Sequence, residues 1–128
     1  MNNKTFLQQI DFGGAQVNIE FIQNLLGEDR QAAIELLEMV LKSVPQSIAK
    51  IRSFEEVDLS VGENQQGLIT AVHNLKSNLR NIGAKNFALA LQIAEENIRK
   101  DIFDETLWEA IAVVENNIDA LTPDDLKI

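Results

Sequence analysis

The sequence lacks cysteine and tyrosine, and it contains only one tryptophan and one histidine. Without cysteine, the chain can form no disulfide, no thiolate metal site and no cysteine nucleophile. Aromatic residues make up 5% of the chain, so the core must be mainly aliphatic, which suits packed helices better than aromatic-rich strands. The remaining composition is that of an ordinary globular protein, and 128 residues fit a single domain spanning 1–128.

Positive charge is also scarce. Eleven basic residues stand against twenty acidic ones, giving a net charge of −9. Nucleic-acid binding needs local positive charge to replace counterions on phosphates, so this composition argues against it. No segment has the character of a signal peptide, and no apolar run approaches the roughly 20 residues of a membrane span. We therefore expect a cytoplasmic protein that binds neither nucleic acid nor membrane.

Four segments have apolar residues three and four positions apart, the pattern of a helix with one buried face. They cover about 29–57, 63–82, 85–100 and 106–121. Pro45 lies within the first and should kink or break it; the apolar spacing continues beyond the proline, which favours a kink. The expected buried face of this first helix is Ala33, Leu37, Val40, Val44, Ile48 and Ile51, with Leu36 and Leu41 widening it.

The connections between these segments predict how they are arranged. Gly83 should end the second helix, and Gly83-Ala84 alone separates it from the third, so the two should lie antiparallel and adjacent. Asp104 is a candidate cap for the last helix. A short apolar segment at 17–26 should form a helix over one end. The predicted fold is all-α: an antiparallel up-down four-helix bundle over about 29–121, with this short N-terminal capping helix.

The single histidine, His73, lies about 140° from the centre of the apolar face of its helix and should be exposed. Ile69 and Ser77 lie one turn from it, Arg80 lies two turns on, and Lys76 lies at the edge of the apolar face. A neutral imidazole is a good nucleophile, and nearby cations stabilise a transferring phosphoryl group. A lone exposed histidine is more often simply solvated, however, and spacing alone leaves both readings open.

The segment from His73 to Ala84 reads HNLKSNLRNIGA. It resembles the phosphorylation-site helix of histidine-containing phosphotransfer (HPt) domains, whose pattern is His-x-Leu-Lys-Gly, mostly small residues, then an aliphatic residue followed by Gly and often Ala. The matching residues are His73, Leu75, Lys76, Ile82, Gly83 and Ala84. The resemblance extends in outline over 18–121. It departs at Ser77, where the family has glycine, and a side chain there would narrow the approach of a partner.

The resemblance implies a role for each of several residues. His73 would accept the phosphoryl group, Lys76 would support it electrostatically, and Glu95 would bind and orient the imidazole. Phosphate or partner contacts would come from Ser77, Arg80, Gln92, Arg99 and Ile69. An apolar docking patch around Ile69 would be extended by Phe21, Ile22 and Leu25, unless these three are simply buried over the end of the bundle.

By the same resemblance, the chain would be a phosphorelay intermediate of two-component signalling, a carrier and not an enzyme. It would accept the phosphoryl group from a receiver-domain aspartyl phosphate and pass it to another receiver. Its partners would be response-regulator receiver domains or a hybrid histidine kinase, and it would act as a monomer. The chain itself would bind no cofactor; the receiver would supply Mg²⁺.

Three alternatives stay open at this point. A module of the same fold could bind partners without transferring phosphate, a possibility that Ser77 raises. A dimerising kinase hairpin also carries a phosphorylated histidine, and a stable dimer would favour it. A hydrolytic or metal enzyme would have to work with carboxylates and one histidine, and the sequence offers no set of nucleophile, base and orienting group. It also contains no glycine-rich nucleotide-binding loop.

Overall fold

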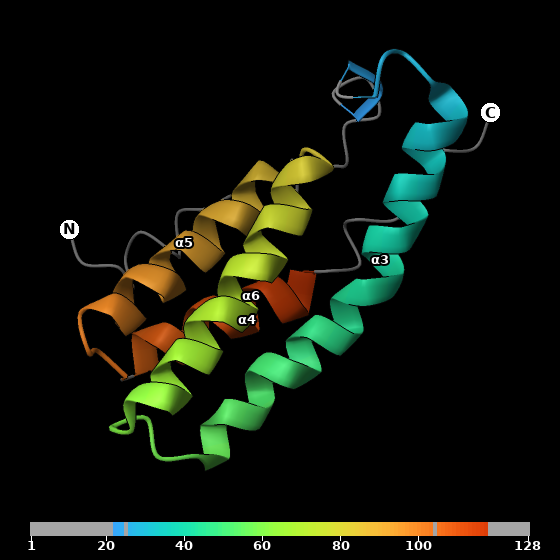
Figure 1. Cartoon of the computed structure of the whole chain (residues 1–128). Coiled ribbons are helices and arrows are strands. Elements are labelled where there is room, and N and C mark those ends of the chain that lie inside the picture. Colours follow the sequence, from blue (N-terminus) through green and yellow to red (C-terminus); the bar gives the residue numbers. More distant parts are fainter. Residues whose placement is uncertain (1–21, 25, 104, 118–128) are drawn as a thin grey trace.

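A computed structural model describes residues 22–24, 26–103 and 105–117, and the regular elements in this part of the chain are all helical (Figure 1). The elements are α3 (Arg30–Arg52), the 3₁₀ helix η1 (Ser53–Glu56), α4 (Gly62–Asn81), α5 (Lys85–Arg99) and α6 (Glu105–Asn117). The all-helical prediction is therefore confirmed. None of the described helices is both long enough and apolar enough to cross a membrane.

Helix α3 begins at Asp29, whose carboxylate accepts a hydrogen bond from the Ala32 backbone N–H at 3.0 Å. The six residues of the predicted central stripe are buried, and Leu36 and Leu41, which are expected to widen it, are partly buried against the core. The helix continues through Pro45 without a break, but it ends at Arg52, earlier than the predicted boundary. The Ser53 hydroxyl donates to the Lys50 carbonyl at 2.6 Å, and the chain tightens into η1.

Helices α4 and α5 are joined by a short turn and pack against each other, so the predicted adjacency is confirmed. Gly83 adopts a left-handed conformation with φ of 83°, and the Ala84 N–H donates to the Leu79 carbonyl at 2.9 Å. This bond closes the end of α4, and the chain turns directly into α5. The two helices lie side by side (Figure 1) and have the most extensive packing of any pair among the described elements.

Helix α5 is more deeply buried than its predicted face of Phe87, Leu91, Ala94 and Ile98. It packs against α4 and also against α6, so further positions around the helix lose contact with solvent. The additional buried residues are Ala88, Ala90, Ile93, Glu95 and Asn97. Two of these are polar, which a single apolar stripe does not predict.

The core is mainly aliphatic, as expected from the scarcity of aromatic residues. Phe87 is the one aromatic among the fully buried large side chains of the described residues. In α6 the predicted residues Leu107, Ile111 and Val114 are buried. The rest of its predicted face (Ile118 and Leu121) and the Asp104 cap lie outside the described residues.

Of the predicted capping segment at 17–26, the structure describes residues 22–24 as helical and places Ile22 in the core. Phe21 and Leu25 lie outside the described residues. Ile22 has no exposed surface, so burial, and not docking, is its role here.

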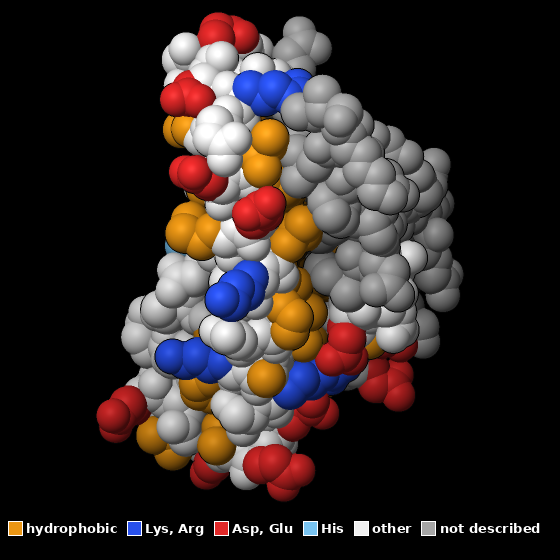
Figure 2. All heavy atoms as spheres, turned by 90° about the vertical axis from the view of Figure 1, so that its right-hand side faces the viewer, with side chains coloured by type: hydrophobic (Ala, Val, Ile, Leu, Met, Phe, Trp, Pro, Cys, Tyr) orange, Lys and Arg blue, Asp and Glu red, His pale blue; other side chains and the backbone are white. Residues whose placement is uncertain are grey.

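The surface is mixed in character. On the face shown in Figure 2, acidic and basic side chains alternate with small apolar patches along the described part of the chain. The positive charges on this face are therefore dispersed among negative ones.

Candidate functional site

His73 lies in the middle of α4 with 52% of its side chain exposed, as the helical spacing predicts. Its Nδ1 atom is 2.9 Å from Oε1 of Glu95 on α5. No other described residue hydrogen-bonds the imidazole, so Nε2 has no protein partner within the part of the chain that the structure describes. Of the two ring nitrogens, only Nδ1 is held by a described residue.

Glu95 is the centre of the site. Only 4% of its side chain is exposed, because α4 packs over it. Besides the contact with His73, its Oε2 accepts a hydrogen bond from the Lys76 ammonium at 2.5 Å, and its Oε1 accepts one from the Arg99 guanidinium at 3.2 Å. Both carboxylate oxygens are therefore engaged, and the orientation of the carboxylate is fixed.

These contacts decide the charge of Glu95. Burial by itself raises the pKa of a carboxyl group, because it disfavours the charged form. Here hydrogen bonds from Lys76, His73 and Arg99 outweigh burial and lower the pKa of Glu95 from 4.5 to about 2. The carboxylate is consequently ionised at any physiological pH.

The ionised carboxylate in turn sets the tautomer of a neutral His73. A carboxylate can only accept hydrogen bonds, so the proton of the neutral ring lies on Nδ1, between the two groups. Nε2 then carries the lone pair. The site therefore presents a nucleophilic nitrogen at the surface, with its proton held on the protein side of the ring.

Lys76 is buried, although the sequence places it only at the edge of the apolar face. Its side chain is 7% exposed, because α5 packs over that edge of α4. Buried ammonium groups need acceptors, and Lys76 has two: Glu95 Oε2 and, at 2.6 Å, Gln92 Oε1. The structure thus brings together five residues that the sequence singled out: His73, Lys76, Gln92, Glu95 and, at the more exposed rim, Arg99.

The other predicted site residues on α4 lie nearby, and none of them hydrogen-bonds the imidazole. Arg80 is exposed, and its side chain makes no ion pair with another described residue. Ser77 is half-buried. Ile69 is half-buried and packs against the core, so only part of it is available to a docking partner.

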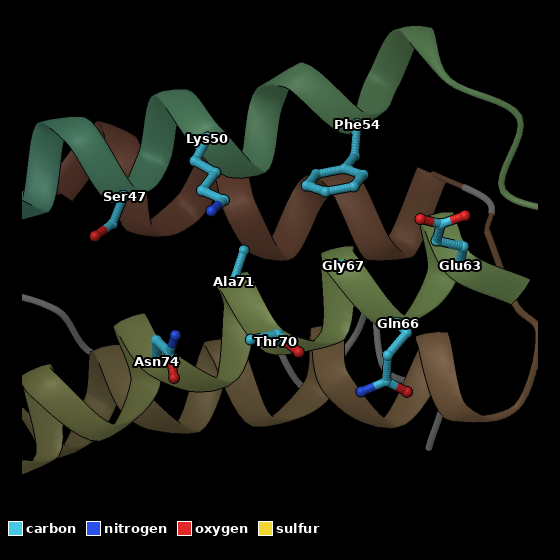
Figure 3. Close-up of a pocket in the computed structure, with 9 residues that line it drawn as sticks. All are labelled: Ser47, Lys50, Phe54, Glu63, Gln66, Gly67, Thr70, Ala71 and Asn74. Carbon is cyan, nitrogen blue, oxygen red and sulfur yellow. The ribbon is translucent and has the colours of Figure 1, made fainter.

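Two features of the site region were not predicted. Glu96 accepts a hydrogen bond from the Gln92 amide at 3.2 Å, a contact that the four-residue spacing on one helix could have suggested. The second is a groove of about 530 Å³ between α3 and α4, which ends at Asn74, the neighbour of His73 (Figure 3). Its lining is Ser47, Lys50, Phe54, Glu63, Gln66, Gly67, Thr70, Ala71 and Asn74. A groove of this kind depends on how two helices face each other, which local spacing does not reveal.

Within the described ranges, no three histidine, cysteine or acidic side chains are grouped so that they could hold a metal ion. Comparison of the chain with protein-family models, curated proteins and solved structures gives no match. Evidence about function therefore comes from the geometry around His73 and from the sequence motif that contains it.

Proposed function

We propose that this chain is a histidine-containing phosphotransfer domain that carries a phosphoryl group on Nε2 of His73. In this proposal the helices form an antiparallel four-helix bundle, and the chain acts as a monomeric carrier in the cytoplasm. The observation that carries the proposal is the contact between the exposed imidazole and the buried, ionised Glu95. It supports a reactive Nε2 because it holds the ring proton on Nδ1.

The chemistry follows from this geometry. The Nε2 lone pair attacks the phosphorus of an aspartyl phosphate on a receiver domain. A nitrogen–phosphorus bond forms while the phosphorus–oxygen bond to aspartate breaks, and the bonding electrons leave with the carboxylate. No proton has to move, because Nδ1 keeps its hydrogen. The positive charge that develops on the ring is stabilised by Glu95, and the reverse reaction delivers the group to a second receiver.

The cations of the site have different parts in this proposal. Lys76 is tied to Glu95 and Gln92 within the protein, whereas the Arg99 side chain is 60% exposed beside the same carboxylate. Arg99 and the exposed Arg80 are therefore better placed to reach phosphoryl oxygens or a partner's acidic residues. Mg²⁺ would be supplied by the receiver domain.

The proposed partners are response-regulator receiver domains or the receiver of a hybrid histidine kinase. They would dock over the exposed face of α4 that carries His73, Ile69 and Ser77. The groove between α3 and α4 adjoins this face at Asn74 and would enlarge the contact surface (Figure 3).

A phosphotransfer assay tests the proposal. The purified protein is incubated with a phosphorylated receiver domain and Mg²⁺, and label on the protein is followed over time. Acid-labile, base-stable label is expected on the wild type and on Glu38→Gln, an exposed change on α3. His73→Gln should abolish the label while circular dichroism shows unchanged helicity. Label that persists in His73→Gln would refute the assignment.

A second candidate is a module of the same fold that binds receivers without accepting phosphate. The observation in its favour is Ser77, one turn from His73, where HPt domains have glycine. An unlabelled but folded wild type that still binds a receiver in a pull-down would support this alternative. A stable dimer in light scattering would instead favour a kinase hairpin.

A further inference from the structure

The buried ammonium of Lys76 donates a hydrogen bond to an acceptor that lies outside the sequence motif around His73. Its side chain is 7% exposed, so water cannot readily replace a missing partner. Glu95 Oε2 provides one acceptor and Gln92 Oε1 provides the second, at 2.6 Å. Gln92 lies on α5, one turn before Glu95, so both acceptors come from the same face of one helix.

The orientation of the Gln92 amide is dictated by its neighbours. The Lys76 ammonium can only donate, so it must face the amide oxygen. The Glu96 carboxylate can only accept, and it lies 3.2 Å from the amide nitrogen. The two contacts thus select one of the two possible orientations of the amide, and they hold its oxygen toward the site.

A chain of contacts connects this amide to the imidazole. Glu96 holds Gln92, Gln92 holds the Lys76 ammonium, and the ammonium holds Oε2 of Glu95. With Oε2 fixed, Oε1 is fixed too, and this is the oxygen that faces Nδ1 of His73. The direction of the imidazole is therefore set in part by a residue that does not touch it.

From these contacts we infer that Gln92 is a positioning residue of the site: it holds Lys76 against Glu95 and so keeps the His73 proton on Nδ1. The inference rests on the proposed function for its meaning, since only the Nδ1–H tautomer offers Nε2 as the phosphoryl acceptor. It also gives Lys76 a structural task in the unphosphorylated protein, as the cation that fixes the carboxylate.

The experiment uses three variants of the full chain. Gln92→Met keeps the length of the side chain and removes the acceptor. Gln92→Glu restores an acceptor for the ammonium. Gln46→Met, at an exposed position on α3, is the matched control for a glutamine-to-methionine change on a helix. Circular dichroism verifies that each variant is folded.

Two readouts are taken on each variant. Nitrogen-15 NMR of the neutral imidazole in the unphosphorylated protein reports which ring nitrogen carries the proton, and the labelling assay reports the transfer rate. For Gln92→Met we expect a shift of the ring toward the Nε2–H tautomer. We also expect transfer to be slower by roughly ten- to a hundredfold, by analogy with the loss of a residue that orients a metal-binding histidine. Gln92→Glu should recover both, and Gln46→Met should change neither.

The outcomes separate the inference from the proposed function. An unchanged tautomer in Gln92→Met, or a Gln92→Glu variant as impaired as Gln92→Met, would overturn the positioning role. A third outcome is also possible: the tautomer changes in Gln92→Met, but the wild type accepts no phosphoryl group. That result would support the positioning role and refute phosphotransfer.

Discussion

Nδ1 of His73 and Oε1 of Glu95 lie 2.9 Å apart, although the two residues are 22 positions apart in the sequence. The two side chains differ sharply in environment, since the imidazole is half-exposed and the carboxylate is buried. This arrangement divides the work of the site. The group that would react is accessible to a partner, and the group that orients it is shielded from water and from competing hydrogen bonds.

The low pKa of Glu95 predicts a pH-dependent contribution to stability. Because its pKa is lowered from 4.5 to about 2 on folding, the stabilisation is fully present above the ordinary pKa and is lost as the pH falls toward 2. A lowering of this size corresponds to about 3 kcal/mol. We expect the unfolding free energy of the wild type to be higher than that of Glu95→Gln at pH 7. The difference between the two proteins should be smaller at pH 3. Urea unfolding of both proteins at the two pH values measures this difference. A difference that does not change with pH would contradict a lowered pKa for Glu95.

The two cations that bind Glu95 should differ in their contribution to stability. Lys76→Met leaves the buried carboxylate without its Oε2 partner and should lower the unfolding free energy by about 3 kcal/mol. Arg99→Met removes an ion pair whose basic side chain is 60% exposed and should cost less than about 1 kcal/mol. Denaturant unfolding at neutral pH compares the two variants. Equal losses of unfolding free energy in the two variants would show that burial does not make the Lys76–Glu95 pair more stabilising than the Arg99–Glu95 pair.

The same Lys76→Met variant should also slow phosphotransfer by roughly ten- to a hundredfold, because the carboxylate that orients His73 is then free to move. The labelling assay measures this rate. A folded Lys76→Met protein that transfers at the wild-type rate would remove Lys76 from the mechanism.

Leu75 is a test of the core beneath the site. Its side chain is 1% exposed on the inner face of α4, so Leu75→Ala should lower the unfolding free energy by about 2–5 kcal/mol. Met39→Ala is the matched control, because Met39 is 62% exposed on α3 and should change stability by less than about 0.5 kcal/mol. Thermal or urea unfolding compares them, and similar losses would show that α4 is not packed as described.

Ser77 provides a prediction about access to the histidine. Ser77→Gly removes a side chain one turn from His73 and should raise the transfer rate, while costing about 0.5 kcal/mol of stability through lower helix propensity. Asn78→Gly imposes a similar helix penalty at the next position and should not raise the rate. If both variants transfer at the same rate, the serine does not restrict the approach of a receiver.

Much of the fold could be predicted from local spacing. The six buried residues of α3 and the turn at Gly83 follow from helical periodicity and from the conformational freedom of glycine, both of which are local properties. The end of α3 could not be located in this way. The hydroxyl of Ser53 bonds back to the chain and the helix tightens there, although the apolar pattern continues further.

The residues of the site could be predicted from the sequence, but the extent to which they are buried could not. Lys76 and Glu95 both lie at the edges of apolar faces, where the sequence alone leaves them half-exposed. Both side chains are buried because α4 and α5 pack against each other along these edges. Each position would be half-exposed on an isolated helix, and the neighbouring helix covers it. The contact between Gln92 and Lys76 arises in the same way. The spacing of residues within one helix predicts which of its faces is buried. The site lies at the interface between two helices, which this spacing does not predict.

The short turn at Gly83-Ala84 determines whether the chain can tolerate insertions between α4 and α5. In a helix each added residue advances the axis by about 1.5 Å and rotates the following side chains by about 100°. One extra residue between α4 and α5 would therefore carry Glu95 away from His73, or else force the turn to bulge, even if no existing residue were altered. A substitution that keeps both the length of the turn and the positive φ at Gly83 would leave this geometry in place. The contact between His73 and Glu95 therefore depends on the number of residues that separate them along the chain. A change in that number would break the contact even if every existing residue were kept.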